Sequence, residues 1–201
     1  MFDWLATWVT NVIETLGYPG LTILVALENL FPPIPSEVIL PLAGFLTGQG
    51  KFSFALVLIA STLGSLIGAL ILYAIGVALG RGGIRRLFEK YGYLALLTAE
   101  DLNRAENWFD RWGPIAVFTG RLVPVVRSLV SIPAGYRRMP LVQFIPLTVF
   151  GSLLWNGALV SLGWAFGENW HAIEEYVGWL QYVVVAVVAI GLMMLTVLIR
   201  P

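Results

Sequence analysis

Four charged side chains stand inside stretches of sequence that are otherwise apolar: Glu28, Glu37, Arg121 and Arg127. One such charge at the centre of a membrane helix costs ~2.5–3.5 kcal/mol on insertion scales. Side chains that bear this cost pair with one another or line a wet pathway. Two interpretations are therefore open. The four residues form ion pairs that pin their segments together, or they line a polar route for a substrate.

The order of the charges favours an anionic substrate. The two acidic residues come first in the chain, and the two arginines follow, six positions apart on either side of a proline. Planar guanidinium groups bind phosphate oxygens in pairs, and the N-terminal ends of broken helices add a favourable field. Arg121 and Arg127 are therefore the candidate phosphate-binding residues. Glu28 and Glu37 are candidates for proton exchange or for pairing with these arginines.

Prolines interrupt both stretches that hold these charges, residues 19–48 and residues 113–136. Each proline removes a backbone donor from a helix, so neither stretch is expected to be one continuous span. A broken backbone at membrane depth persists only where protein or a water-filled cavity covers it. We therefore predict two re-entrant helical hairpins. The residues assigned to forming them are Pro32, Pro33, Pro35, Pro124, Pro133, Gly44, Gly120 and Gly135.

The rest of the chain has the composition of a membrane protein. Hydrophobic residues make up 58% of it and charged residues 12%, about half the charged share of a soluble domain. This excludes an ordinary cytosolic enzyme and a disordered protein. Three uncharged runs, 53–79, 141–167 and 179–199, are each long enough for a transmembrane helix, which needs ~20 residues.

Three further segments are polar or amphipathic. Residues 2–16 have helical spacing of apolar side chains, which fits an interfacial helix or a short helix packed on the core. Residues 80–112 predict two amphipathic surface helices, and residues 168–178 form an acidic connector.

The placement of basic residues predicts the topology. Ten of the 12 lysines and arginines lie in residues 81–138, and another is Arg200. The positive-inside rule puts these segments in the cytoplasm, with the N-terminus, Lys51 and the acidic connector outside and the C-terminus inside. The two hairpins then enter from opposite sides, as in an inverted repeat.

The sequence therefore predicts a single all-α integral membrane domain over residues 1–201. Its first repeat is 1–80, a polar cytoplasmic linker is 81–112, the second repeat is 113–167, and a C-terminal transmembrane helix is 179–199.

Motifs for several enzyme classes are missing from the sequence. It has no Gly-Lys-Ser/Thr phosphate loop, no Gly-x-Ser-x-Gly nucleophile elbow, no cysteine, and His171 as its single histidine. The formal net charge is zero, which does not favour nucleic acid. We therefore expect a transporter rather than an enzyme, with no cofactor, no metal and no nucleic-acid partner.

Two motifs resemble signatures of the DedA family of membrane proteins. The first is ENLFPPIPSE, from Glu28 to Glu37, followed by Gly44. The second is GRLVPVVRS, from Gly120 to Ser128, which continues to Gly135. The resemblance covers about residues 15–170 and adds Ser128 to the candidate phosphate-binding residues.

This resemblance implies two re-entrant hairpins with inverted symmetry and a role in moving lipids across the bacterial inner membrane. The arginine hairpin is most similar to the branch that recycles undecaprenyl phosphate, a lipid carrier of cell-wall synthesis. The implied partners are a lipid with a phosphate headgroup, the surrounding membrane lipids and, in a homo-oligomer, further copies of the chain. Two alternatives remain: a phosphatidylethanolamine flippase or scramblase, and a non-transporting factor in proton-dependent membrane homeostasis.

Overall fold

A computed structural model describes residues 3–31, 36–91, 99–124 and 126–166 of the protein. These ranges are helical and contain no strand. The helices are α1 (Asp3–Leu30), α2 (Ser36–Gly48), α3 (Phe54–Tyr91), α4 (Ala99–Trp112), α5 (Ile115–Gly120), α6 (Val126–Leu129), α7 (Ser131–Tyr136) and α8 (Leu141–Phe166).

Three of the helices are long and apolar enough to cross a membrane: Thr7–Leu30, Phe54–Arg86 and Leu141–Ala165. The second and third coincide with the uncharged runs at 53–79 and 141–167. The structure thus confirms that these two runs form helices of the length and apolar composition of a membrane span. The predicted helix 179–199, the acidic connector 168–178 and His171 lie outside the described residues.

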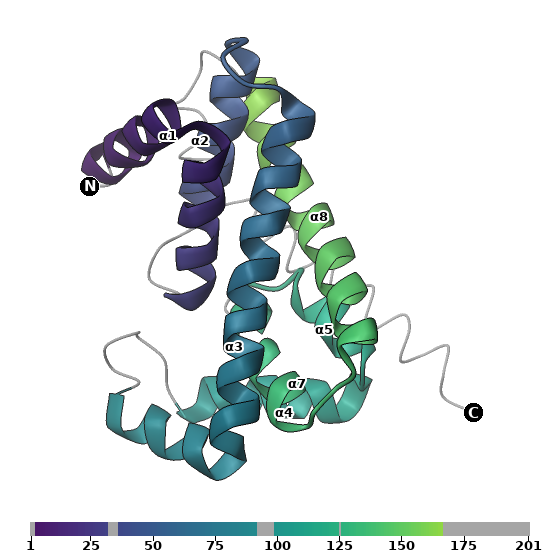
Figure 1. The fold of residues 1–201 in the computed structure, drawn as a ribbon. Helices are drawn as coiled ribbons and strands as arrows, with labels where there is room; N and C mark the ends of the chain where they lie inside the picture. Colours follow the sequence, from purple (N-terminus) through teal and green to yellow (C-terminus); the bar gives the residue numbers. More distant parts are fainter. Residues whose placement is uncertain (1–2, 32–35, 92–98, 125, 167–201) are drawn as a thin grey trace.

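The first candidate span lies in α1, which covers parts of two segments predicted separately, the interfacial helix 2–16 and the hairpin 19–48. α1 is not straight. α1 bends at Gly17, whose positive φ of 62° is open to glycine without steric cost. The first segment lies across one end of the molecule, and the second runs alongside α3 (Figure 1). Val9 and Ile13 of the first segment are buried, whereas Trp8 on its other side is exposed. The segment is thus amphipathic and also packs on the core.

α3 bends in the same way at its other end. Gly80 has a φ of 62°, and the chain continues as a second helical segment that leads toward α4. The part of α3 after Gly80 and the helix α4 correspond to the two surface helices predicted for residues 80–112. A Cβ on Gly80 would meet no atom within 4 Å, so this glycine does not serve close helix packing. Its role is the bend.

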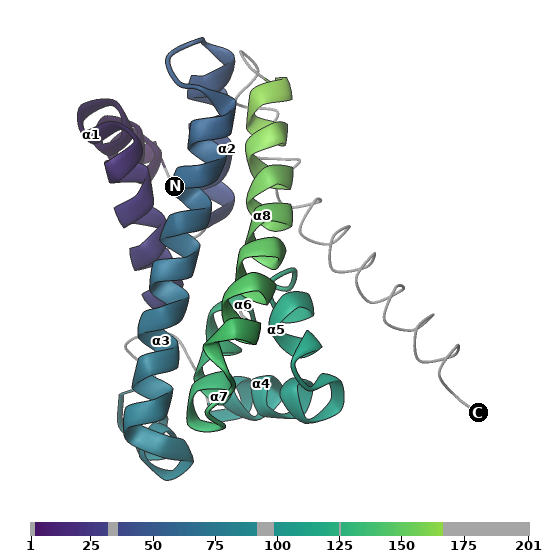
Figure 2. The same ribbon diagram turned by 45° about the vertical axis from the view of Figure 1, so that its right-hand side comes forward.

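The two long helices α3 and α8 cross the centre of the molecule, and the shorter helices gather at its two ends (Figures 1 and 2). At one end, α1 packs on α3 and α2 packs on α8. At the other end, α7 packs on α3 and α5 packs on α8. Each proline-rich segment therefore contacts both long helices.

Backbones of neighbouring helices approach each other most closely at four glycines. A Cβ on any of them would overlap a backbone carbonyl of the facing helix, α2 against α8 or α3 against α7. These residues are Gly44, Gly163, Gly76 and Gly135. Gly44 and Gly135, which the sequence assigned to forming the hairpins, thus lie inside helices at their tightest contacts.

The prolines do not all break the helices as expected. Pro41 lies inside α2, and Pro133 is the third residue of α7. The first residues of a helix have no intrahelical partner for their N–H groups, so proline is tolerated at Pro133. Pro124 lies between α5 and α6, where the helix is broken as predicted. Pro32, Pro33 and Pro35 lie outside the described residues.

Candidate functional site

A buried ion pair joins the second proline-rich segment to the end of α1. Arg127 of α6 contacts the Glu28 carboxylate, and both side chains are almost fully buried. The pair joins two of the four charged residues singled out by the sequence. A buried charge is tolerated when it is paired, which explains how this segment accommodates both groups.

The second arginine lies in the same region. Arg121 caps α5 and is 1% exposed. Its Nη1 donates to Asn29 Oδ1 at 3.3 Å, and its Nη2 donates to Ser131 Oγ at 2.6 Å. Asn29 is held in turn, because its Nδ2 donates to the carbonyl of Val25 at 2.9 Å. Arg121 makes no ion pair within the described ranges, so its buried positive charge has only neutral partners there.

Hydrogen-bonding capacity remains at this site. Seven buried side-chain polar atoms have no hydrogen-bond partner in the part of the chain that the structure describes, and three of them belong to residues of this site: Arg121 Nε, Glu28 Oε2 and Trp155 Nε1. Most buried polar groups in proteins are paired, so each exception asks for an explanation. Arg121 Nε and Trp155 Nε1 can only donate, and they are therefore suited to acceptor oxygens.

One face of α8 supports both arginines. The Arg127 guanidinium lies over the Trp155 ring, with Cζ 6.0 Å from the ring centroid. The stem of Arg121 passes Gly151, where an added Cβ would lie 2.7 Å from Arg121 Cβ. Gly151 and Trp155 are four residues apart and thus share a helix face. α8 therefore contacts the guanidinium of Arg127 at one turn and the stem of Arg121 at the turn before it.

The remaining predicted residues are placed differently. Ser128 is 4% exposed on α6, and its role in binding phosphate stays a prediction. Glu37 is half-buried in the first turn of α2 and forms no ion pair with a described residue. Gly120 ends α5 in close contact with Val130 of the same proline-rich segment.

Two polar side chains within the long helices hydrogen-bond to other segments of the chain. Tyr73 Oη donates to the carbonyl of Met139 at 2.7 Å. Asn156 Nδ2 donates to Ser65 Oγ at 3.2 Å, joining α8 to α3.

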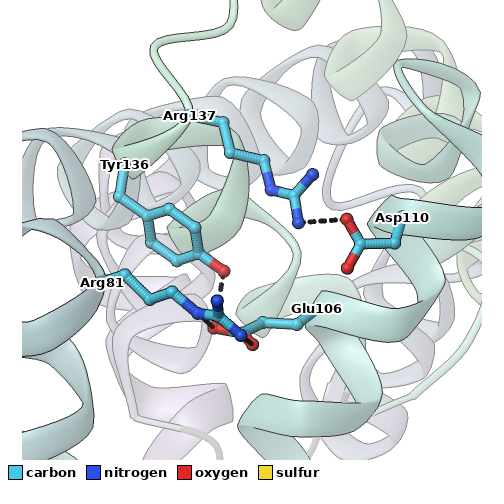
Figure 3. A network of polar contacts seen from close by, with 5 residues as sticks. All are labelled: Arg81, Glu106, Asp110, Tyr136 and Arg137. Carbon is cyan, nitrogen blue, oxygen red and sulfur yellow. Dashed lines mark hydrogen bonds and ion pairs between the residues drawn. The ribbon is translucent and has the colours of Figure 1, made fainter.

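A second polar cluster, which does not include Arg121 or Arg127, joins α3, α4 and the end of α7 (Figure 3). Arg81 donates twice to Glu106, from Nε at 3.1 Å and from Nη2 at 2.7 Å. Tyr136 Oη donates to the same carboxylate at 2.8 Å, and Arg137 pairs with Asp110. Burial raises the pKa of Glu106, but the hydrogen bonds from Arg81 and Tyr136 outweigh it, so the pKa is lowered overall.

The family follows from the match to known sequence patterns. The pattern of the VTT domain matches residues 34–165, which include α2, both arginines and nearly all of α8. The chain belongs to the VTT-domain family, the DedA family. No solved structure matches the chain.

Relatives of this VTT-domain protein include two proteins named as transporters and one named as alkaline phosphatase-like. Undecaprenyl phosphate transporter A of Staphylococcus aureus is 37% identical over 161 residues, covering 80% of this chain and 79% of that protein. The transporter of the same name in Bacillus subtilis is 37% identical over 172 residues, covering 86% and 81%. An alkaline phosphatase-like protein of Lactococcus lactis subsp. cremoris is 42% identical over 183 residues, covering 90% and 86%.

Three residues of the site were not assigned a role from the sequence: Asn29, Ser131 and Trp155. Ser131 lies four positions after Arg127, so a search for polar neighbours at helical spacing would have flagged it. Asn29 follows Glu28 directly and would have been flagged only as a polar residue adjacent in the chain. Trp155 gave no such signal, since an aromatic residue in an apolar run is ordinarily a core residue.

We expect the Glu106 cluster to contribute pH-dependent stability. Glu106→Gln should cost ~1 kcal/mol at neutral pH, because Arg81, its main partner, is 68% exposed. A lowered pKa means that this contribution is present above 4.5, the ordinary value, and is lost as the pH falls through the lowered value. Thermal unfolding in detergent at pH 7 and below pH 4.5 measures it.

Asp110→Asn is the matched control, because Asp110 and its partner Arg137 are both exposed. It should change stability little at either pH. An equal gap between the wild type and Glu106→Gln at both pH values would contradict the assigned charge interaction.

Proposed function

We propose that this protein is a lipid translocase of the bacterial inner membrane that carries a lipid with a phosphate headgroup, with undecaprenyl phosphate as the favoured substrate. The observation that carries the proposal is the pair of buried guanidinium groups on a broken helical segment, one without a charged partner in the described residues. The relatives named undecaprenyl phosphate transporter A support the choice of lipid.

The architecture we propose for transport is an inverted repeat of two re-entrant hairpins. It is supported by the reciprocal packing in which α2 lies on α8 and α7 lies on α3. Each of these contacts is made through a glycine from both helices. The two proline-rich segments also sit at opposite ends of the long helices (Figure 2). In this arrangement the repeats are residues 1–80 and 113–167.

The ion pair suggests how phosphate binding is coupled to proton movement. A phosphate entering the site competes with Glu28 for the fork of Arg127. If Arg127 turns to the phosphate, the Glu28 carboxylate is buried without a counter-ion. A buried charge in that position is costly and takes up a proton instead. Proton uptake on Glu28 would thus accompany binding, and Glu37 remains a second candidate for proton exchange.

A second function has one specific observation in its favour. The lactococcal relative carries the name alkaline phosphatase-like protein, so hydrolysis of the lipid phosphate is the competing activity. A phosphatidylethanolamine flippase or scramblase, and a membrane factor that transports nothing, complete the alternatives.

The deciding experiment is reconstitution of the purified protein in liposomes with ³²P-labelled undecaprenyl phosphate. We expect the headgroup to cross the bilayer without release of inorganic phosphate, and an imposed pH gradient to change the rate. Release of phosphate would identify an enzyme. Movement of labelled phosphatidylethanolamine alone would identify the phospholipid flippase, and no movement of either lipid would contradict transport.

Orientation can be tested on two exposed residues at opposite ends of the molecule. Lys51 lies in the loop before α3, and Arg86 lies beyond the bend at Gly80. The placement of basic residues puts Lys51 outside and Arg86 in the cytoplasm. Lys51→Cys should therefore react with an impermeant thiol reagent added to intact cells, whereas Arg86→Cys should react only after permeabilisation. The opposite pattern would invert the proposed topology.

A further inference from the structure

Trp155 packs in the core beside Arg127, and it also carries a hydrogen-bond donor that this packing leaves unused. Its side chain is 3% exposed and belongs to an apolar cluster with residues of α1 and α2. The indole N–H is nevertheless buried without a partner in the described part of the chain. A buried tryptophan usually finds a hydrogen-bond partner for this group, so the position is not explained by packing alone.

The location of the ring connects this donor to the proposed phosphate site. The guanidinium of Arg127 lies over the ring face, where the aromatic quadrupole attracts a cation. Arg121 reaches the same helix one turn earlier, at Gly151, and its Nε is also buried without a partner. One face of α8 therefore contacts Arg127 at Trp155 and the stem of Arg121 at Gly151, and two single-proton donors beside it, Arg121 Nε and Trp155 Nε1, have no partner in the described residues.

We propose that Trp155 is a specificity residue of the site, donating its indole N–H to a headgroup that ends in a phosphate monoester. This inference rests on the proposed function and refines its substrate class. A monoester presents three terminal oxygens and a charge of about −1.5 to −2 at neutral pH. Arg121, Arg127 and Trp155 then supply one donor group for each oxygen. A phosphodiester has two such oxygens and leaves the third donor unpaired, which is penalised in a buried site.

The test removes the N–H and keeps an aromatic ring. Purified wild type and Trp155→Phe are compared in detergent for binding of undecaprenyl phosphate and of its methyl ester, a diester with the same chain. We expect Trp155→Phe to bind the monoester roughly ten- to a hundred-fold more weakly, as for a lost hydrogen bond to a charged group. Its preference for the monoester over the diester should fall by a similar factor.

Thermal unfolding separates this role from packing. Because the N–H has no partner among the described residues, its removal should not lower stability through a lost hydrogen bond. Trp164→Phe is the matched control on the same helix, because Trp164 is 55% exposed and lies about two and a half turns beyond Trp155. It should leave binding of both lipids unchanged. If Trp155→Phe fails to fold, Trp155→benzothienylalanine preserves the shape of the indole without the N–H and takes its place.

The outcomes distinguish the two proposals. If the wild type binds the monoester and the variant without the N–H binds it equally well, Trp155 is a packing residue and the proposed function stands. If the wild type binds neither lipid, the proposed function is wrong and the role of Trp155 is wrong with it. Weaker monoester binding by a variant without the N–H that unfolds at the wild-type temperature supports the inference. Weaker binding by Trp155→Phe that comes with a lowered unfolding temperature and is absent from Trp155→benzothienylalanine assigns Trp155 to packing.

Discussion

Arg127→Ala is expected to destabilise the folded protein by about 3–5 kcal/mol, because it leaves the Glu28 carboxylate buried without its counter-ion. Adding Glu28→Gln removes the stranded charge and should restore most of that stability. Chemical or thermal unfolding in detergent measures both steps. Together with Glu28→Gln alone, the size of the rescue gives the free energy that the two residues share.

The same double variant separates a packing role from a binding role. If the arginine only neutralises Glu28, Arg127→Ala with Glu28→Gln should fold and transport like the wild type. If the arginine grips phosphate, the double variant should fold but bind undecaprenyl phosphate poorly. Wild-type transport by the double variant would therefore refute the proposed phosphate contact.

Arg127→Lys refines the result, because it keeps the charge and loses the planar fork. It should weaken binding of the lipid phosphate roughly ten- to a hundred-fold while the protein stays folded. Binding equal to that of the wild type would mean that a point charge is sufficient at this position.

Gly163→Ala is expected to have an effect of similar size on stability. The added Cβ would overlap the backbone carbonyl of Pro41, which has no side-chain freedom with which to move away. α2 and α8 would have to separate along their contact, at a cost of about 3 kcal/mol or more. The fraction of folded protein recovered after extraction and the unfolding temperature both report this loss.

Gly157→Ala on the same helix is the control. A Cβ there would make only an ordinary contact with Leu58, at 3.7 Å. Alanine favours a helix over glycine by up to ~1 kcal/mol, so this variant should be as stable as the wild type or slightly more stable. Equal stability of the two alanine variants would show that the α2–α8 contact yields more easily than the close backbone approach indicates.

Several features of the fold follow from local sequence. The spans at α3 and α8 could be predicted because a long uncharged run has few alternatives to a membrane helix. The break between α5 and α6 could be predicted because Pro124 cannot continue a helical ladder. The bend at Gly17 could not, since a glycine in an apolar helix serves equally well for close packing, as at Gly76.

For the candidate site too, part could be predicted from local sequence and part depended on tertiary packing. By itself, the sequence determined that Glu28 and Arg127 had to be paired or functional, because the cost of an isolated charge in an apolar segment is a local property. Only the tertiary structure decided that Glu28, and not Glu37, pairs with Arg127, and that Arg121 has neutral partners. It also decided that Trp155 supports the site. These contacts join residues far apart in the chain, and they depend on how α1, α6 and α8 pack, which no local pattern specifies.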